Sequence, residues 1–172
     1  SLDSNDNNLE NNLMSIFIEK CTHLGKDIYS AGISMIDVST GKNKITEVIH
    51  SYEDENYTDN EIKRLLNYYN PVELLIHTKD FSESKESFIN KYDINCNLYV
   101  NFFSEKKSFL QKNYQNELLN KVFKINSGNS VEVLNLERRE EVLISYIYLL
   151  NYIYEHKNSL IDSLERPEEI NN

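Results

Sequence analysis

The chain has 172 residues, of which 40% are hydrophobic and 27% are charged, and its formal net charge is −10. These values are typical of one globular domain that can bury its own core. The acidic balance weighs against tight binding of a nucleic-acid backbone by the chain alone, because that affinity comes mainly from Lys and Arg. No stretch reaches the roughly 18 apolar residues that span a bilayer. The start of the sequence lacks the basic and apolar regions of a signal peptide, so we expect no membrane partner.

The first 38 residues predict a polar leader followed by two strands. Residues 1–12 are acidic and rich in Asn, which indicates a disordered leader or a linker. Residues 14–21 form a short alternating run that is typical of a strand. Residues 28–38 alternate most clearly, with large apolar side chains on one face and small ones around Gly32 on the other. The small face predicts that another element packs closely against Gly32.

A turn and a further strand follow. Asp37 begins the stretch Asp-Val-Ser-Thr-Gly, in which Asp caps the turn amides, Thr40 lies in the turn and Gly41 can adopt positive φ. Residues 43–50 alternate again, so we expect an antiparallel hairpin with residues 28–38. The strand at residues 14–21 is expected to join this hairpin as a third member.

The middle of the chain predicts a crossover from a helix to a buried strand. Thr58 and Glu61 fit a capping box at the start of a helix, and Pro71 is expected to end that helix because proline disfavours helical geometry in the residue before it. Residues 72–77 are nearly all apolar, which suits a central parallel strand covered on both faces. Glu73 is expected to cap or pair beside this strand.

The remaining residues predict helices around one more strand. The expected elements are a helix at 82–91, a strand at 96–103, a helix at 104–124 and a mostly apolar helical segment at 131–163. The order predicts an α/β fold: a ribonuclease-H-like mixed sheet of antiparallel and parallel strands, flanked by helices and with a long C-terminal helix. We expect one domain at 13–130 and a separate helical segment at 131–172, whose burial needs contacts from outside the chain.

The search for chemistry gives no catalytic, cofactor or metal site in this chain. A P-loop, a His-Glu-x-x-His helix and a Cys-x-x-Cys pair are all missing from the sequence. The two cysteines, Cys21 and Cys96, are too few for a disulfide framework and favour a reducing, intracellular compartment. One catalytic alternative is a two-metal nuclease that uses Asp37, Glu73 and Asp80, since such a site needs several converging carboxylates.

Two stretches of the chain carry a resemblance to a known family. They are AGISMIDVSTGKNKITEV, which begins at Ala31, and EIKRLLNYYNPVELLIH, which ends at His77. Together they resemble the connector domain, the second domain, of MutS-family DNA mismatch-repair proteins. The matching residues are Gly32, Asp37, Ser39, Thr40, Gly41, Glu47, Leu65, Pro71, Glu73, Leu74 and Leu75. The tail departs from the family pattern, because Glu140-Glu141-Val142 replaces a Gly-rich start of the helix.

The resemblance implies a role that the residues alone do not reveal. A connector of this family has a ribonuclease-H-like fold without nuclease activity, and residues 131–172 would begin the lever region. It joins the mismatch-reading domain to the lever, clamp and ATPase domains, and it offers a surface to a MutL-type partner. ATP, Mg²⁺ and DNA would be bound by the larger parent protein, which would be intracellular and associated with DNA. Surfaces near the acidic loop at 51–57 are one candidate for partner contact, and a protein-binding module of an unrelated pathway is a further alternative.

Overall fold

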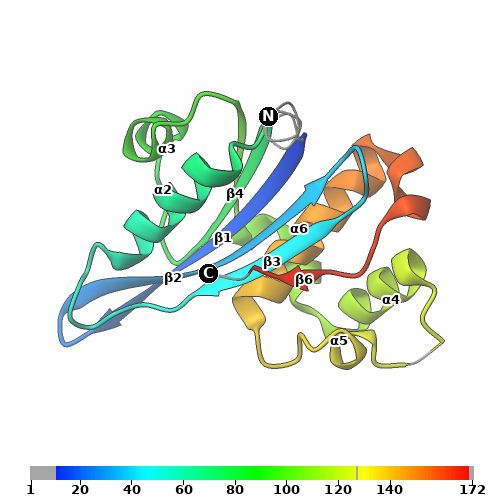
Figure 1. Cartoon of the computed structure of the whole chain (residues 1–172). Helices are drawn as coiled ribbons and strands as arrows, with labels where there is room; N and C mark the ends of the chain where they lie inside the picture. The colour runs from blue at the N-terminus through cyan, green and yellow to red at the C-terminus, as the bar shows by residue number, and fades with distance from the viewer. Residues whose placement is uncertain (1–10, 127, 171–172) are drawn as a thin grey trace.

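The computed structural model describes residues 11–126 and 128–170, and its centre is a mixed sheet (Figure 1). The strand order is β5-β4-β1-β2-β3-β6. β1, β2 and β3 form an antiparallel meander, whereas β4 is parallel to β1 and to β5. The strands are β1 (Asn12–His23), β2 (Lys26–Asp37), β3 (Asn43–Val48), β4 (Glu73–Lys79), β5 (Asn97–Phe102) and β6 (Glu168–Glu169). The predicted mixed sheet is confirmed.

Helices cover both faces of this sheet. In Figure 1, α2 and α3 lie over one face and α6 lies over the other. The α-helices are α2 (Tyr57–Tyr69), α3 (Lys85–Tyr92), α4 (Lys112–Phe123), α5 (Ser130–Val133) and α6 (Glu140–His156). Two 3₁₀ helices, η1 (Phe103–Leu110) and η2 (Asn158–Ser163), complete the described structure. Within the described residues, none of these helices is long and apolar enough to cross a membrane.

Alternation along the strands divides the interior into two apolar cores. Met14, Ile16 and Ile18 of β1 belong to the core under α2 and α3. Leu13 and Phe17 belong to the core that contains most of α6. Successive side chains of a strand point to opposite faces, so one strand contributes to both cores and holds the two helical layers together.

The face of β2 with small side chains lies directly beneath α6. A Cβ atom at Gly32 would lie 2.1 Å from the backbone carbonyl carbon of Glu141, so only glycine fits. Nearby, the hydroxyl of Ser145 donates to the carbonyl of Ser15 at 2.8 Å. The Ser145 oxygen also lies 2.8 Å from the hydroxyl of Ser34. The predicted close packing against the small face is therefore confirmed, and α6 is the element that makes it.

The burial of α6 corrects one expectation. The helix is buried from Val142 to Leu150 by the sheet and its neighbours, so contacts from outside the chain are not needed to cover it. Apolar residues around most of its circumference bury well because sheet, η1, α4 and η2 surround it. The assignment of residues 131–172 to a lever region remains a prediction.

Three predicted boundaries also differ from the structure. The leader at 1–12 lies mostly outside the described residues, but buried Asn12 already begins β1. The single helix predicted at 104–124 is η1 followed by α4. The helical segment predicted at 131–163 is divided into α5, α6 and η2, and Asn135, with a left-handed φ of 60°, lies in the first break. Periodicity of apolar residues persists across such a break, so it does not reveal one.

The predicted capping box at Thr58 is wrong. α2 begins at Tyr57, one residue earlier, and Asn56 precedes it without a side-chain cap. The hydroxyl of Thr58 instead donates to the backbone carbonyl of Tyr29 at 2.5 Å. A tertiary hydrogen bond to β2 thus replaces the local one, and it fixes the start of α2 on the sheet.

Candidate functional site

Asp37 closes the turn between β2 and β3. Its carboxylate accepts the backbone amide of Ser39 at 2.8 Å, and its backbone carbonyl accepts the amides of Thr40 at 3.2 Å and Gly41 at 2.8 Å. The hydroxyl of Thr40 accepts the amide of Lys42 at 3.2 Å. An Asp side chain that bonds the amide two residues later is the arrangement of an Asx turn. This carboxylate is therefore engaged by its own turn.

Gly41 is required in this turn for two reasons. Its φ is +82°, a left-handed value, and a Cβ atom there would lie 2.0 Å from the backbone oxygen of Ser163. The carbonyl of Gly41 accepts the amide of Glu165 at 3.0 Å, and the side-chain amide of Asn43 donates to the carbonyl of Glu165 at 2.6 Å. The turn thus receives residues 163–170, which we call the strap. The strap continues along the sheet edge to β6.

Pro71 and Glu73 lie where α2 passes into β4. α2 ends at Tyr69, Asn70 is left-handed with a φ of 45°, and Pro71 is buried. The carboxylate of Glu73 accepts the hydroxyl of Tyr152 at 2.5 Å and lies 3.6 Å from the Nζ atom of Lys157. Burial, followed by the hydrogen bond to Glu73, raises the pKa of Tyr152 above its ordinary value. Glu73 therefore ties the start of β4 to the end of α6.

The three carboxylates of the nuclease alternative do not converge. Asp37 and Glu73 lie at the end of the sheet where β1 begins, because Asn12 pairs with Asp37 and Leu13 pairs with Glu73. Asp80 follows the opposite end of β4. At a rise of about 3.3 Å per residue, it lies about 20 Å or more from Glu73. Among the described residues, no group of three or more His, Cys, Asp or Glu side chains is placed to hold a metal ion. This geometry does not fit a two-metal site built from the predicted residues.

A smaller charged cluster lies at the carboxyl ends of the parallel strands. Glu19 of β1 forms an ion pair with Lys79 of β4 at 3.1 Å. Glu141 lies in the first turn of α6 at the same end, and burial, together with the charges of Glu19, Glu140 and Glu47, raises the pKa of its carboxyl group. Lys79 neutralises the charge of Glu19. We therefore interpret this cluster as part of the packing at the start of α6.

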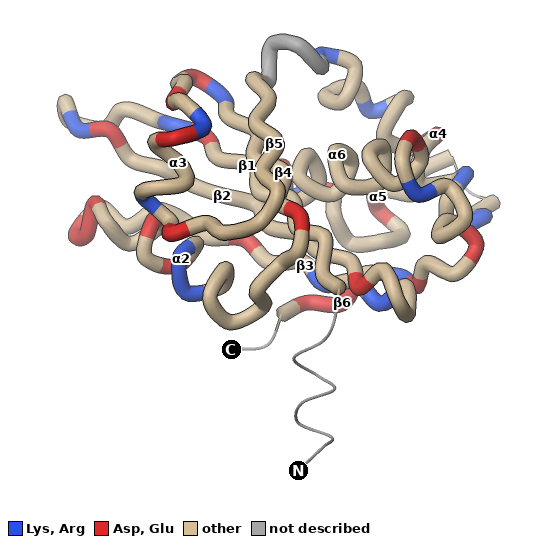
Figure 2. The backbone as a smooth tube through the Cα atoms, turned by 90° about the horizontal axis from the view of Figure 1, so that it is seen from above, with Lys and Arg blue, Asp and Glu red and all other residues tan. Residues whose placement is uncertain are grey.

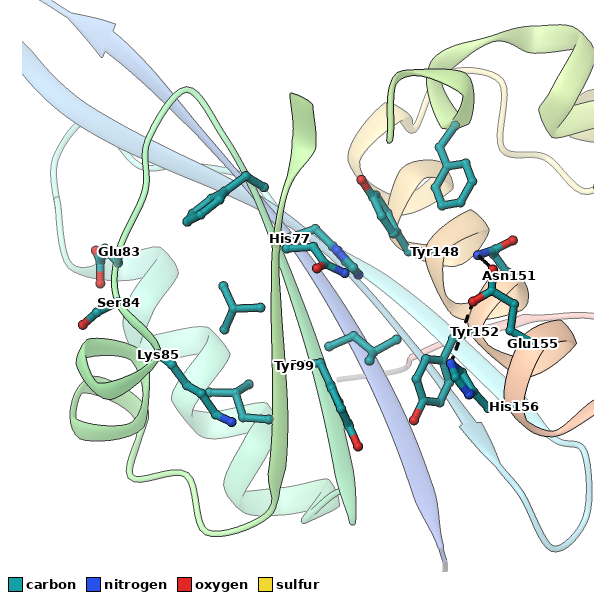
Figure 3. A pocket seen from close by; sticks show the side chains of 16 residues that line it. His77, Glu83, Ser84, Lys85, Tyr99, Tyr148, Asn151, Tyr152, Glu155 and His156 are labelled. Carbon is teal, nitrogen blue, oxygen red and sulfur yellow. Dashed lines mark hydrogen bonds and ion pairs between the residues drawn. The ribbon is translucent and has the colours of Figure 1, made fainter. Parts of the chain in front are cut away.

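A cleft of about 680 Å³ opens between β5 and the second half of α6 (Figure 3). Tyr148, Tyr152 and His156 line its helical side, and their spacing of four residues places them on one face of α6. His77 stacks on Tyr148 with ring centroids 3.5 Å apart, and Tyr152 lies 4.4 Å from His156. This volume is in the range of small-molecule sites. In the sequence, the four-residue spacing of Tyr148, Tyr152 and His156 was the available signal for this cleft.

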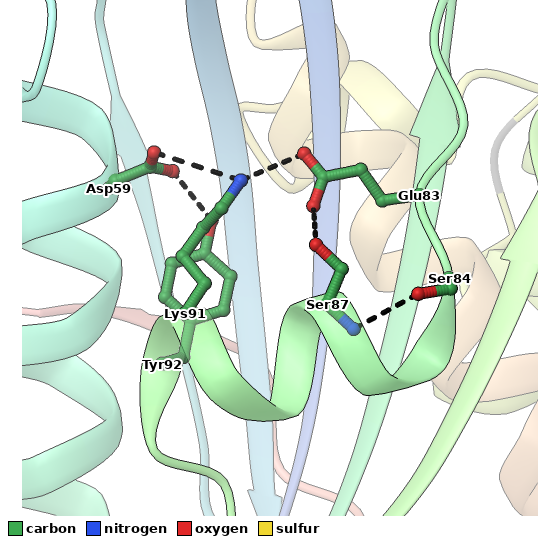
Figure 4. Close-up of polar contacts among 6 residues, drawn as sticks. All are labelled: Asp59, Glu83, Ser84, Ser87, Lys91 and Tyr92. Carbon is green, nitrogen blue, oxygen red and sulfur yellow. Dashed lines mark hydrogen bonds and ion pairs between the residues drawn. The ribbon is translucent and has the colours of Figure 1, made fainter.

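A polar network joins α2 to α3 on the opposite face (Figure 4). The hydroxyl of buried Tyr92 donates to the carboxylate of Asp59 at 2.6 Å. The Nζ atom of Lys91 lies 2.8 Å from the carboxylate of Glu83 and 4.0 Å from that of Asp59. Burial and the charge of Asp59 raise the pKa of Tyr92, which keeps it a neutral donor. Each charge is paired within the network, so it holds the two helices together.

Basic residues are scattered over the surface. Figure 2 shows Lys and Arg positions interspersed with Asp and Glu positions on the helices and loops. Arg139, for example, forms two bonds to Glu169 of the strap, at 2.6 and 2.9 Å. Nucleic-acid recognition by a domain alone usually needs a basic stripe. Weak DNA binding by the domain alone stays a prediction.

Comparison with known proteins identifies the family of this domain. The family model of MutS domain II matches residues 11–165, which is most of the chain. The chain belongs to the MutS domain II family. This domain is also 29% identical, over 182 residues, to a mutS homolog of Acanthamoeba polyphaga mimivirus, a DNA mismatch repair protein. That alignment covers 92% of the present chain and 16% of the viral protein, so the domain spans a small part of its relative.

Solved structures confirm the ribonuclease-H-like fold. The domain is similar to RuvC of Thermus thermophilus, both alone and in complex with a Holliday junction substrate. Each match has a TM-score of 0.51 at 10% identity and covers 87% of the domain and 97% of the RuvC chain. At an identity this low, the match shows that the fold is shared and shows nothing about activity. The resemblance to the mismatch-repair connector is confirmed, and the nuclease chemistry is not transferred.

Proposed function

We propose that this domain is a non-catalytic connector that links mismatch binding to the ATPase state of a MutS-type parent and offers a surface to a MutL-type partner. Its membership of the MutS domain II family is the observation that carries the proposal. In the proposed parent, ATP and Mg²⁺ bind in a separate domain, DNA is held mainly by other domains, and the protein is intracellular and associated with DNA. The short span of the viral relative that the domain covers agrees with this division of labour.

The packing supports a mechanical role. One sheet contributes side chains to both helical layers, and α6 lies against β1 and β2 without room for an added methyl group at Gly32. Close-packed interiors deform little and transmit displacement. In the proposed mechanism, a load applied to either helical layer moves the sheet as one body. Coupling between distant sites requires such an element together with two arrangements of its neighbours.

The partner role can be tested with the MutL-type protein of the same organism. Association is measured by light scattering or surface plasmon resonance for the full parent and for a parent in which residues 11–165 are replaced by a flexible linker. We expect nucleotide-dependent association that disappears with the replacement. Unchanged association would remove the partner surface from this domain.

The nuclease alternative has a simple test of its own. It predicts Mg²⁺- or Mn²⁺-dependent cleavage that Asp37→Asn abolishes. Because the Asp37 carboxylate accepts an amide of its own turn and lies far from Asp80, we expect equal, background-level cleavage by both proteins. Metal-dependent cleavage that the substitution removes would favour the nuclease.

A further inference from the structure

The far end of the β1–β2 hairpin projects beyond the rest of the sheet. β1 pairs with β4 only as far as Glu19, and β2 pairs with β3 only from Ala31 onward. Between these limits the described strands pair with each other alone. Figure 1 shows this end of the hairpin extending past α2, with the loop between β3 and α2 beside it. We call the exposed end, together with residues 49–57, the hairpin tip.

Leu24 at this tip is in an unfavourable conformation without any gain from burial. The turn has two central residues, Leu24 with a φ of 50° and Gly25 with a φ of 76°. Hairpin turns with two positive φ values prefer Asn followed by Gly, because an L residue with a branched side chain is strained there. Leu24 is nevertheless 90% exposed. The other described non-glycine residues with positive φ are Asn70, Asp80, Asp93, Lys124 and Asn135.

The loop that runs alongside the hairpin end (Figure 1) carries two further exposed apolar side chains, Tyr52 and Ile49. The ring of Tyr52 lies 4.3 Å from that of His23 and 4.7 Å from that of His50. His50 is in turn held by Ser30 at 2.9 Å, so the loop is fixed against β2. Tyr52 is 61% exposed and Ile49 is 62% exposed. Ordered aromatic and aliphatic side chains on a projecting element are typical of protein interfaces.

The charge around these groups selects the partner. Residues 46–62 contain six Asp and Glu residues and no Lys or Arg, whereas the hairpin end itself carries Lys20, Lys26 and Asp27. Three of the six acids, Glu47, Asp59 and Glu61, pair with Arg139, Lys91 and Arg64, so the acidic part of the tip is the loop from Glu53 to Glu55. Glu53, Asp54 and Glu55 are exposed, and within the described structure none of them forms an ion pair. The loop is nevertheless ordered, because Ser51 accepts the amide of Asp54 at 3.2 Å and Asp54 accepts the amide of Asn56 at 3.0 Å. A fixed acidic rim is complementary to Lys and Arg and repels DNA.

We propose that the hairpin tip is a docking surface for a basic protein segment that carries an exposed apolar side chain. Leu24 and Tyr52 contact the apolar side chain, and the acidic rim contacts its Lys and Arg neighbours. The positive φ and the exposure of Leu24 are the observations that motivate a binding role for this side chain. The proposal rests on the proposed function, in which the domain binds partners, and it names the surface and the chemistry.

The test uses a capped peptide of four Lys, one Leu and one Phe as the probe. Titration into the ¹⁵N-labelled chain is expected to shift amides of residues 20–30 and 49–57 and to saturate. Leu24→Asn is expected to weaken this binding about tenfold, the scale for an apolar side chain of that size. The same substitution is expected to raise the Tm, since Asn suits the turn better. Lys124→Asn changes another exposed residue with positive φ and is the matched control, with unchanged binding.

Several results would overturn the proposal. They are shifts centred elsewhere, such as the cleft beside β5, equal binding by the Leu24→Asn and unaltered chains, and equal binding of a peptide with Lys alone. Binding of a DNA duplex at the tip would assign the surface to nucleic acid instead. The outcome is separate from that of the proposed function, because the peptide titration uses neither the parent nor the MutL-type protein.

Discussion

Single atoms decide the packing where β2 crosses beneath α6. Gly32 lies so close to Glu141 and Val142 that an added Cβ would be 2.1 and 2.4 Å from their backbone atoms. Backbone atoms cannot rotate away as a flexible side chain can, so α6 itself would have to move. Overpacking of this kind typically costs 1–3 kcal/mol and occasionally more.

Gly32→Ala should therefore destabilise the domain by about 3 kcal/mol. Urea denaturation of the purified chain measures the change, and Gly128→Ala is the control, because a Cβ at Gly128 would meet no atom within 4 Å. Equal stability of the two variants would show that α6 does not approach β2 as closely as described.

Glu141 gives a prediction about pH. Burial, with help from neighbouring acids, raises its pKa above the ordinary 4.5, so the charged form is disfavoured in the folded state. The cost is absent at a pH below 4.5, where the group is protonated in both states, and it develops as the pH rises through the folded pKa. Glu141→Gln should thus raise the Tm at pH 7 and leave it nearly unchanged at pH 4. Thermal melts at both values measure this, and a larger gain at pH 4 would contradict it.

At the scale of elements, β6 in the strap is the shortest strand of the described sheet. β6 has two residues, which pair with Lys44 and Ile45 of β3. Beside this pairing, the amide of Ile170 bonds to Ile45 at 2.9 Å, the side chain of Ile170 is buried, and Arg139 pairs with Glu169. Glu169 is partly exposed, so the ion pair contributes well under about 1 kcal/mol. Short elements with few buried contacts open locally before the core unfolds.

Arg139→Ala should increase hydrogen exchange of the Ile170 amide by roughly threefold, since the free energy of local opening falls by the value of one exposed pair. Arg138→Ala removes the neighbouring exposed charge and serves as the control. Native-state exchange followed by mass spectrometry gives both rates. Equal rates would mean that Arg139 does not hold β6 against the sheet.

Some elements could be predicted from the sequence better than others. Strand alternation predicted β1, β2, β3 and β5 well because each strand has two unlike faces, and the apolar run at 72–77 predicted β4. The capping box failed because a bond from Thr58 to Tyr29 replaced the local one, and only the fold brings these residues together. β6 is too short for any periodicity to reveal it. The cleft combines residues from β4, β5 and α6, whose proximity the sequence does not state.

At the scale of the whole molecule, the fold places its sequence-predicted residues in supporting roles. Asp37, Thr40 and Gly41 build the turn that receives the strap, and Glu73 ties β4 to α6. The ribonuclease-H-like sheet does not bring Asp37, Glu73 and Asp80 together, as the nuclease alternative required. This arrangement agrees with the proposed connector role.

The most direct test of the connector account is ATP hydrolysis by the full parent on mismatched and on matched duplexes. The rates are compared for the intact parent and for the parent whose residues 11–165 are replaced by a flexible linker. The account predicts that basal hydrolysis and mismatch binding persist while the difference between the two duplexes disappears. An undiminished difference after the replacement would contradict the account, because mismatch binding would then reach the ATPase without this domain.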